Sequence, residues 1–378
     1  MPFHFPRLFV IALTTLRPCG SWLEAAESPA WAGRAPNGDV VRVAVPAPEN
    51  PRFAHLAWPK AVRTADGTLV LGYLMGAAHV GNSCPTVSIS TDHGKTFSAP
   101  HVLKEFGPGR DYADSGNMAM GIAPDGAVIV LAHGYTGNTV HAIFGWRSTD
   151  SGRTWKPVDT SGLGVSKTGS ATGSIVALAD GRMMAVGHYR PPATSQPGGI
   201  WQSVSGDGGL TWGAPSQVTN LRTVEPVLVR QKDRLLVFSR GGGEAAGRQF
   251  ISVSDDGGRS WFTEMANLKP IAQHATALAH PFAMVDPHDP EALLAVTFER
   301  PMPGAGQLWR GRAATGKGVN FSFTHVRALV ELPKIAGDTH TDFGYAWLVP
   351  LEGRRALVFY YHGLNRGGSP IWVVETSL

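Results

Sequence analysis

Ser148-Thr-Asp-Ser-Gly-Arg-Thr-Trp155 is one of four copies of a pattern, Ser-x-Asp-x-Gly-x-(Thr/Ser)-aromatic, that sets the period of this chain. The other copies are Ser90-Thr-Asp-His-Gly-Lys-Thr-Phe97, Ser205-Gly-Asp-Gly-Gly-Leu-Thr-Trp212 and Ser254-Asp-Asp-Gly-Gly-Arg-Ser-Trp261. The Asp of such a box accepts hydrogen bonds from turn amides, the Gly takes a positive φ, and the aromatic ring covers the turn. Each box therefore predicts a hairpin turn with a structural purpose.

The spacing of the boxes predicts the architecture. They begin at residues 90, 148, 205 and 254, so successive copies are 58, 57 and 49 residues apart. A period near 50 residues with about four short strands per repeat is typical of a β-propeller. The chain of 378 residues has 43% hydrophobic residues, 46 Gly and 28 Pro, which suits a single large all-β domain with many turns.

A second repeated feature counts six units instead of four. Turn signals lie between paired apolar runs at Asp66-Gly67, Asp125-Gly126, Asp180-Gly181, Lys232-Asp-Arg234, His288-Asp-Pro290 and Glu352-Gly353. The apolar run Val40–Val45 precedes the first of these hairpins and has no partner there, so we expect it to pair with the last unit and close the ring. The prediction is an all-β, six-bladed β-propeller over residues 37–378.

The N-terminus has a different character. Arg7 precedes the apolar run Leu8–Leu16, and small residues follow at Ala25-Ala26, which predicts a signal peptide over residues 1–26 and a secreted or periplasmic protein. The run is too short to span a bilayer. After cleavage Cys84 would be the only cysteine, which excludes a cysteine-based metal cluster. The net charge of +4 is spread along the chain, so we expect no nucleic-acid partner.

A functional site is expected where the inner strands of the propeller begin and the next strands end. The six inner strands are expected to begin near Trp58-Pro59, Asn117-Met118, Gly173-Ser174, Glu225, His280 and Tyr345. The second strands are expected to end near Met75, His133, His188, Arg240, Glu299-Arg300 and His362. Polar and titratable side chains at equivalent strand ends are costly in a core and useful in a binding site.

Six units with these boxes resemble the sialidase (neuraminidase) superfamily. The stretch from Val224-Glu-Pro to Phe-Ser-Arg240 is similar to the sialidase segment in which a Glu opens a strand and an Arg closes the next one. The stretch from Phe343-Gly-Tyr to Phe-Tyr-Tyr361 is similar to the segment that carries the family's nucleophilic Tyr. The resemblance implies that Tyr345 and Glu225 form the nucleophile pair and that Arg240 is one of three arginines that bind the substrate carboxylate. A Tyr nucleophile suits a substrate whose carboxylate would repel an anionic nucleophile, and Arg offers two parallel donors to that carboxylate.

The resemblance also implies residues that are harder to locate. A second carboxylate-binding arginine is expected in the fifth unit, where Arg310 and Arg312 lie on one side of a strand and Arg310 is preferred; Arg300 lies further back. In the first unit Leu56-Ala-Trp-Pro59 has no Arg before its Pro. The loop Gly76–Pro85 lacks the acidic residue of the family, so His79 is the expected general acid, with Asp111 or Asp114 of the next unit as the alternative.

Three functions fit these residues. The first is a sialidase-type hydrolase that releases terminal sialic acid or a related acidic sugar. The second is a lyase or hydrolase of acidic polysaccharide that uses His133, His188, His280 or His362 together with Tyr345. The third is a glycan-binding propeller without catalysis. None of them requires a cofactor or a metal ion, although the sequence is compatible with a calcium ion bound by a loop.

Overall fold

The computed structural model describes residues 33–137, 140–165, 168–190, 198–313, 321–335 and 341–378. The predicted signal peptide lies outside these residues. Within them the chain forms β-strands and two 3₁₀ helices, η1 (Ser161–Leu163) and η2 (Gly243–Ala245). No helix in this part of the chain is both long and apolar enough to cross a bilayer.

The strands follow one another in groups that match the predicted units. The first strand and units 1 and 2 comprise β1 (Val40–Val45), β2 (His55–Arg63), β3 (Leu69–Gly76), β4 (Cys84–Ser90), β5 (His101–Val102), β6 (Asp114–Ile122), β7 (Val128–Thr136), β8 (Val140–Ser148) and β9 (Lys156–Pro157). Units 3 and 4 comprise β10 (Gly169–Ala171), β11 (Gly173–Ala177), β12 (Met183–Tyr189), β13 (Ile200–Ser205), β14 (Ser216–Thr219), β15 (Thr223–Gln231), β16 (Arg234–Gly241), β17 (Gln249–Ser254) and β18 (Phe262–Met265). Units 5 and 6 comprise β19 (Ala277–Leu278), β20 (Phe282–Asp286), β21 (Asp289–Arg300), β22 (Gly304–Ala313), β23 (Phe321–Leu332), β24 (Thr341–Pro350), β25 (Arg355–Leu364) and β26 (Ile371–Ser377).

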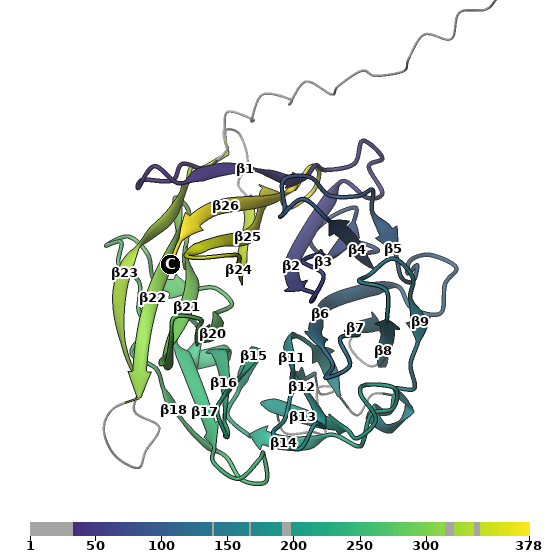
Figure 1. The fold of residues 1–378 in the computed structure, drawn as a ribbon. Coiled ribbons are helices and arrows are strands. Elements are labelled where there is room, and N and C mark those ends of the chain that lie inside the picture. The colour runs from purple at the N-terminus through teal and green to yellow at the C-terminus, as the bar shows by residue number, and fades with distance from the viewer. Residues whose placement is uncertain (1–32, 138–139, 166–167, 191–197, 314–320, 336–340) are drawn as a thin grey trace, which may run out of the picture.

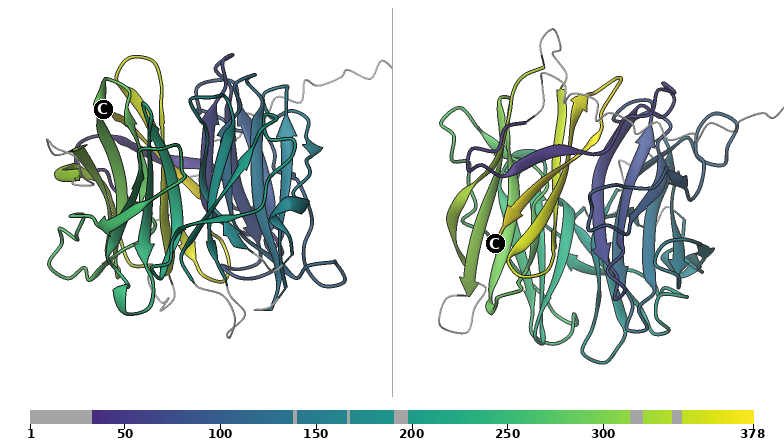
Figure 2. Two further views of the ribbon diagram at one scale, coloured as in Figure 1. Left: turned by 90° about the horizontal axis from the view of Figure 1, so that it is seen from below. Right: turned by 45° about the horizontal axis from the view of Figure 1, so that its top comes forward.

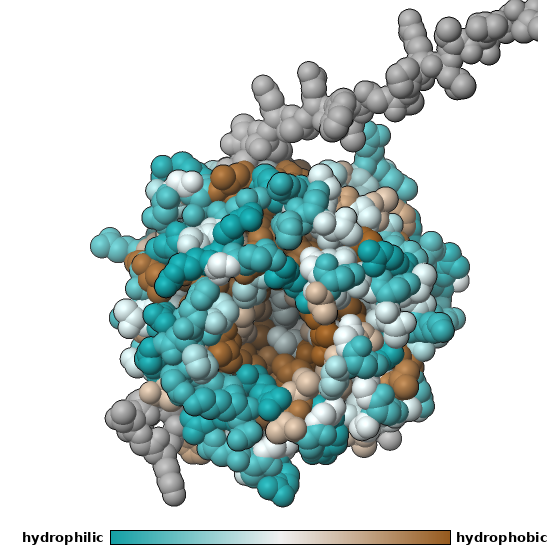
Figure 3. Space-filling view, in the orientation of Figure 1, coloured by the Kyte–Doolittle hydropathy of each residue, from teal (hydrophilic) through white to brown (hydrophobic). Residues whose placement is uncertain are grey.

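The strands are arranged as an all-β propeller around a central axis (Figure 1). Strand pairing gives five sheets in the described part of the chain, because a parallel pairing of β11 with β6 joins units 2 and 3 into one nine-stranded sheet. Pairing by itself counts five sheets, and six units result only if the nine-stranded sheet is divided at that junction, so the count of six blades stays a prediction. Figure 2 shows the ring from two further directions, and the space-filling view in Figure 3 shows that its face is hollowed at the centre.

The six predicted turns all connect antiparallel neighbours. They join β2 to β3, β6 to β7, β11 to β12, β15 to β16, β20 to β21 and β24 to β25. The prediction that Val40–Val45 closes the ring is also confirmed, because β1 pairs with β26 from Val40↔Glu375 to Val45↔Ile371. The N-terminal strand therefore covers an edge that the last unit would otherwise expose.

The four boxes share one hydrogen-bond pattern, as the sequence predicted. In the second box Ser148 Oγ donates to Asp150 Oδ1 over 2.7 Å, and the Gly152 amide donates to Ser148 Oγ over 2.9 Å. The Thr154 amide and hydroxyl donate to the Asp150 carboxylate over 2.8 and 2.6 Å. Gly152 has a φ of 86°, where glycine is favoured.

Each box also packs against a neighbouring unit. A Cβ added to the glycine at the fifth position of each box would lie close to a side chain of the preceding unit: Gly94 to Leu357, Gly152 to Val70, Gly209 to Ile129 and Gly258 to Met184. The boxes thus hold adjacent units together at the outer turns, while apolar residues of the inner strands form the core between them. Polar side chains therefore lie at the ends of the inner strands, next to the axis.

Candidate active site

The inner strands share an unusual backbone feature at the positions predicted to line the axis. Trp58, Asn117, Glu225 and Tyr345 have φ values of 55°, 56°, 58° and 54°, and Gly173 has 88°. Register shifts next to the four non-glycine residues show that each sits in a β-bulge. Bulges and left-handed residues redirect side chains and gather at functional sites. Five of the six positions equated in the sequence therefore share one backbone conformation, and His280 of unit 5 is the exception.

Tyr345, Glu225 and Arg240 meet although 120 residues separate the first two. The Tyr345 hydroxyl donates to Glu225 Oε1, and the Arg240 guanidinium grips the same carboxylate, with Nη2 3.0 Å from Oε1 and Nε bonded to Oε2. Tyr345 comes from β24, Glu225 from β15 and Arg240 from β16. Nε and Nη2 of Arg240 therefore both bind the Glu225 carboxylate, and Nη1 takes no part in this ion pair.

Charge and burial set the protonation states of this group. Burial by itself would raise the pKa of Glu225, but the hydrogen bond and charge of Arg240 outweigh it and hold the pKa well below its ordinary value. Burial and the Glu225 charge raise the pKa of Tyr345. At neutral pH the site thus holds a carboxylate next to a neutral phenol, an arrangement in which Glu225 can accept the phenolic proton.

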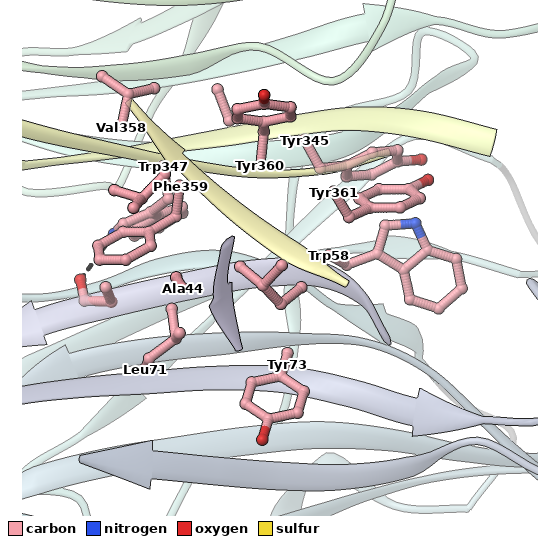
Figure 4. Packing of buried hydrophobic residues seen from close by; sticks show 14 of the residues in the cluster. Ala44, Trp58, Leu71, Tyr73, Tyr345, Trp347, Val358, Phe359, Tyr360 and Tyr361 are labelled. Carbon is pink, nitrogen blue, oxygen red and sulfur yellow. Dashed lines mark hydrogen bonds between the residues drawn. The ribbon is translucent and has the colours of Figure 1, made fainter. Parts of the chain in front are cut away.

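Aromatic rings surround the Tyr345 phenol. The His280 ring stacks on it with centroids 5.0 Å apart and an interplanar angle of 18°, and the centroids of Trp58 and Tyr361 lie 6.0 and 5.9 Å away. Figure 4 shows Trp58, Tyr345 and Tyr361 gathered at one end of the inner strands. Among the described residues, neither ring nitrogen of His280 has a hydrogen-bond partner. Burial, followed by the Lys60 charge, holds the pKa of His280 well below its ordinary value.

His79, the predicted acid, also contacts Trp58, with ring centroids 4.9 Å apart. Its Nδ1 contacts Asp342 Oδ2, and Asp342 Oδ1 accepts a hydrogen bond of 2.8 Å from the Tyr361 hydroxyl. His55 Nε2 lies 3.3 Å from the same Asp342 Oδ2. The sequence analysis missed Asp342 and His55. Asp342 stands three residues before Tyr345, and no local pattern distinguished it.

Lys60 is a second residue that the sequence analysis missed. It follows Trp58 by two positions on β2 and is fully buried, with Nζ 3.3 Å from the carbonyl oxygens of both Trp58 and Pro59. Burial lowers the pKa of Lys60 to about 7, against an opposing effect of the Glu225 charge. A lysine within an apolar inner strand was the available signal, since lysine is rarely buried without a partner.

The prediction that Arg310 and Arg312 bind substrate at the axis is wrong. Both bond to Asp289 at the turn between β20 and β21, and their side chains are 45% and 58% exposed. β22 begins at Gly304, at the end of unit 5 that lies next to the site. Arg310 and Arg312 lie near the other end of this strand. Arg300, at the axial end of β21, instead donates from Nη2 to the Phe343 carbonyl over 2.6 Å.

Asp114, the alternative acid, connects the loop before β4 with β6 and β7. Its carboxylate accepts hydrogen bonds from the Ser83 amide over 2.6 Å, the Ser115 amide over 2.8 Å and the Tyr135 hydroxyl over 3.0 Å. Burial raises its pKa. These contacts link units 1 and 2 and do not reach Tyr345 or Glu225. Asp111 is on the surface, 3.9 Å from Lys104.

The remaining predicted histidines differ in their distance from the phenol. The Glu225 amide donates to His188 Nδ1 over 3.2 Å, so His188 supports the nucleophile pair directly; burial, followed by Arg190, lowers its pKa to about 3. His133 is buried against His141, with Nε2 2.9 Å from its Nδ1. Buried His362 lies beside Phe343, and burial lowers its pKa to about 4. The structure brings His188 and His280 to the Tyr345 group, but not His133 or His362.

The fold is shared by sugar-processing enzymes of low sequence identity. A protein of unknown function from Dyadobacter fermentans has a TM-score of 0.68 at 20% identity, with 89% of this chain and 99% of that chain covered. The K499G mutant of NanB sialidase from Streptococcus pneumoniae has a TM-score of 0.65 at 12% identity, with 89% and 70% covered. An α-L-arabinanase of Penicillium chrysogenum, complexed with arabinobiose, has a TM-score of 0.63 at 15% identity, with 90% and 98% covered. At these identities the likeness establishes the fold.

Sequence comparison identifies the family. No curated protein matches this chain. The family model described as a BNR repeat-like domain matches residues 43–224 and 107–297, and these overlapping matches extend over more than half of the chain. The repeated boxes, their shared hydrogen bonds and these matches agree that this protein belongs to the BNR repeat-like domain family.

Proposed function

We propose that this protein is a glycoside hydrolase of sialidase type, which releases a terminal sialic acid or a related acidic sugar through a covalent intermediate on Tyr345. The observation that supports it is the group formed by Tyr345, Glu225 and Arg240 beside the axis. The likeness to NanB sialidase supports the proposal at the level of the fold.

The first step of the proposed reaction forms a bond between the Tyr345 oxygen and the anomeric carbon while the glycosidic C–O bond breaks. Glu225 accepts the phenolic proton, and Arg240 balances the charge of the carboxylate before the step. The leaving oxygen gains a proton from the His79 imidazole, since the alternative donor Asp114 already accepts hydrogen bonds from Ser83, Ser115 and Tyr135. Water then breaks the Tyr345–sugar bond and restores the phenol.

The decisive test compares two tyrosine variants on a chromogenic sialoside. Tyr345→Phe removes the nucleophile and should lower kcat by about 10³-fold or more. Tyr360→Phe is the matched control. Tyr360 is a buried tyrosine of β25, the strand that pairs with β24, and its hydroxyl has no partner among the described residues. Its ring stands apart from those of Tyr345 and Tyr361 (Figure 4). Turnover by Tyr345→Phe within tenfold of the unchanged protein would exclude the covalent mechanism.

A second candidate function, elimination on an acidic polysaccharide, is favoured by the stacking of His280 on Tyr345, since neither nitrogen of this imidazole has a hydrogen-bond partner in the described part of the chain. A neutral imidazole and a phenol can act as base and acid beside a uronate carboxylate. Acidic polysaccharides incubated with the protein would then yield unsaturated products that absorb in the ultraviolet. Reducing ends without such absorption would support hydrolysis, and binding without either product would support a glycan-binding propeller.

We also propose that the chain is exported, on the basis of the N-terminal sequence alone. Expression of the full chain and of a chain without residues 1–26, followed by fractionation of the cells, tests this. The full chain should lose its N-terminal segment and leave the cytoplasm, and the shortened chain should stay inside.

A further inference from the structure

His55, His79 and Asp342 converge on one point next to the candidate active site. One ligand atom from each, two imidazole nitrogens and one carboxylate oxygen, lies within 4.8 Å of the others. His55 begins β2, His79 lies in the loop after β3, and Asp342 belongs to β24. His55 and Asp342 are buried, while the His79 side chain is 34% exposed. The three residues therefore form a mostly buried cluster that solvent reaches from the His79 side.

The hydrogen bond of His55 determines which of its nitrogens carries the proton. Nδ1 lies 2.9 Å from the Leu364 carbonyl oxygen, which can only accept, so Nδ1 is the donor. A neutral His55 then directs the lone pair of Nε2 toward Asp342 Oδ2, 3.3 Å away. Nε2 is buried and makes no hydrogen bond to any described residue. Two electron-rich atoms at this separation repel each other unless a cation, either a proton or a metal ion, lies between them.

The surroundings of the cluster resemble the outer shell of a metal site. Ligating histidines usually donate their other ring N–H to a carbonyl or carboxylate, as His55 does to Leu364. Ligating carboxylates are hydrogen-bonded in turn, as Asp342 Oδ1 is by the Tyr361 hydroxyl at 2.8 Å. Two imidazoles and one carboxylate are a donor set suited to Zn²⁺ and related divalent ions, with a position left open for water or substrate.

We propose that His55, His79 and Asp342 bind one divalent transition-metal ion of the Zn²⁺ class, with an open coordination position facing the axial pocket. The open side is that of His79, whose ring packs on Trp58, and the Trp58 ring in turn lies 6.0 Å from that of Tyr345. The metal site shares His79 with the proposed hydrolase mechanism, but binding of the ion can be measured without substrate. Where that function holds, the ion supplies a cation for the sugar carboxylate at Trp58, where the sequence has no arginine; this part rests on the proposed function.

Metal binding is measured on the full purified chain without substrate. After treatment with a chelator and its removal, the protein is titrated with Co²⁺, whose visible absorption reports its ligands, and then with Zn²⁺ in competition. One ion per chain should bind, and elemental analysis after dialysis against Zn²⁺ should return the same ratio. His55→Ala and Asp342→Asn should each weaken binding by more than about 100-fold, since each removes a ligand.

Two further variants separate a metal site from a folding defect. Tyr361→Phe keeps all three ligands and removes one outer hydrogen bond, so it should weaken binding by roughly 10-fold. His93→Ala removes a surface histidine 3.7 Å from Glu352 and should bind like the unchanged protein. Absence of stoichiometric binding, or equal binding by folded Asp342→Asn protein, would overturn the proposal and leave a protonated His55 as the cation. Tyr345→Phe should retain the metal, so a loss of turnover there does not bear on this site.

Discussion

At the scale of single residues, the pocket depends on backbone positions that most side chains avoid. Trp58, Glu225 and Tyr345 are not glycines, yet each has a φ between 54° and 58°. Such a conformation costs on the order of 1 kcal/mol per residue and persists where the surrounding structure requires it. The bulges direct the Glu225 carboxylate and the Tyr345 phenol toward each other, so this conformational cost maintains the contact on which the proposed chemistry depends.

Lys60 gives a prediction about pH. Its pKa is lowered to about 7 in the folded protein, whereas an unfolded lysine titrates near its ordinary value of 10.5. Between these values the unfolded chain binds a proton that the folded chain does not, so stability rises with pH through this window and is lower below it. Lys60→Met should remove that slope and raise the free energy of unfolding at pH 7 and below by a few kcal/mol, at most about 5.

Urea unfolding at several pH values between 6.5 and 9.5, well away from the carboxylate range, measures this effect. Lys95→Met provides the control, because Lys95 is an exposed residue of the first box and should leave the slope unchanged. A Lys60→Met protein with the same pH slope as the Lys95→Met protein would show that Lys60 is charged and compensated in the folded state.

At the scale of elements, the boxes connect neighbouring units as well as closing turns. Gly209 has a φ of 89°, and a Cβ added there would lie 2.3 Å from Ile129 Cδ1 of unit 2. Gly181, in the turn between β11 and β12, has a φ of 83° with nothing within 4 Å of an added Cβ. The two glycines thus share a conformation and differ in their packing.

Gly181→Ala should therefore cost only the conformational term, about 1 kcal/mol. Gly209→Ala should cost that amount plus overpacking against unit 2, about 3 kcal/mol in total. Chemical denaturation of both variants isolates the contact between units as their difference. Equal losses would mean that the box is only a local turn.

At the scale of the whole molecule, the ring is closed by two segments from opposite ends of the sequence. β1 adds to the edge of β26, and the purple and yellow strands lie side by side in Figure 1. Arg42 of β1 pairs with Glu375 of β26 at 2.8 Å, and Arg327 of unit 5 pairs with Asp39 at 3.0 Å. Closure therefore involves ion pairs as well as backbone hydrogen bonds.

Removal of residues 1–46 should destabilise the protein much more than removal of residues 1–26 alone. The longer deletion takes away β1 and leaves the β26 edge unpaired, which also favours aggregation. We expect a fall in Tm of roughly 5 °C or more, because several kcal/mol of pairing and packing are lost. Thermal unfolding together with light scattering checks both effects, and equal Tm values for the two deletions would show that β1 does not stabilise the ring.

Local patterns allowed most of the fold to be predicted. Each box and each hairpin turn forms within about ten residues, so its residues specify its conformation wherever the rest of the chain lies. Repetition then related the units to one another and identified Glu225 and Tyr345 as equivalent positions, which the structure shows as bulges of the same conformation. Arg310 and Arg312 were misplaced because β22 begins next to the site at Gly304 and runs away from it, so that these two residues pair with Leu294 and Ala292 on the Asp289 half of β21.

The amino-acid sequence by itself determined the repeat, the turns and the family, because these depend on neighbours along the chain. Only the tertiary structure decided that Asp342 meets His55 and His79 and that Lys60 is buried beneath Trp58. Asp342 of β24 is far in the sequence from His55 and His79, and the distance between them depends on how the ring closes. A site built from such long-range contacts has no signature in any one stretch of the chain.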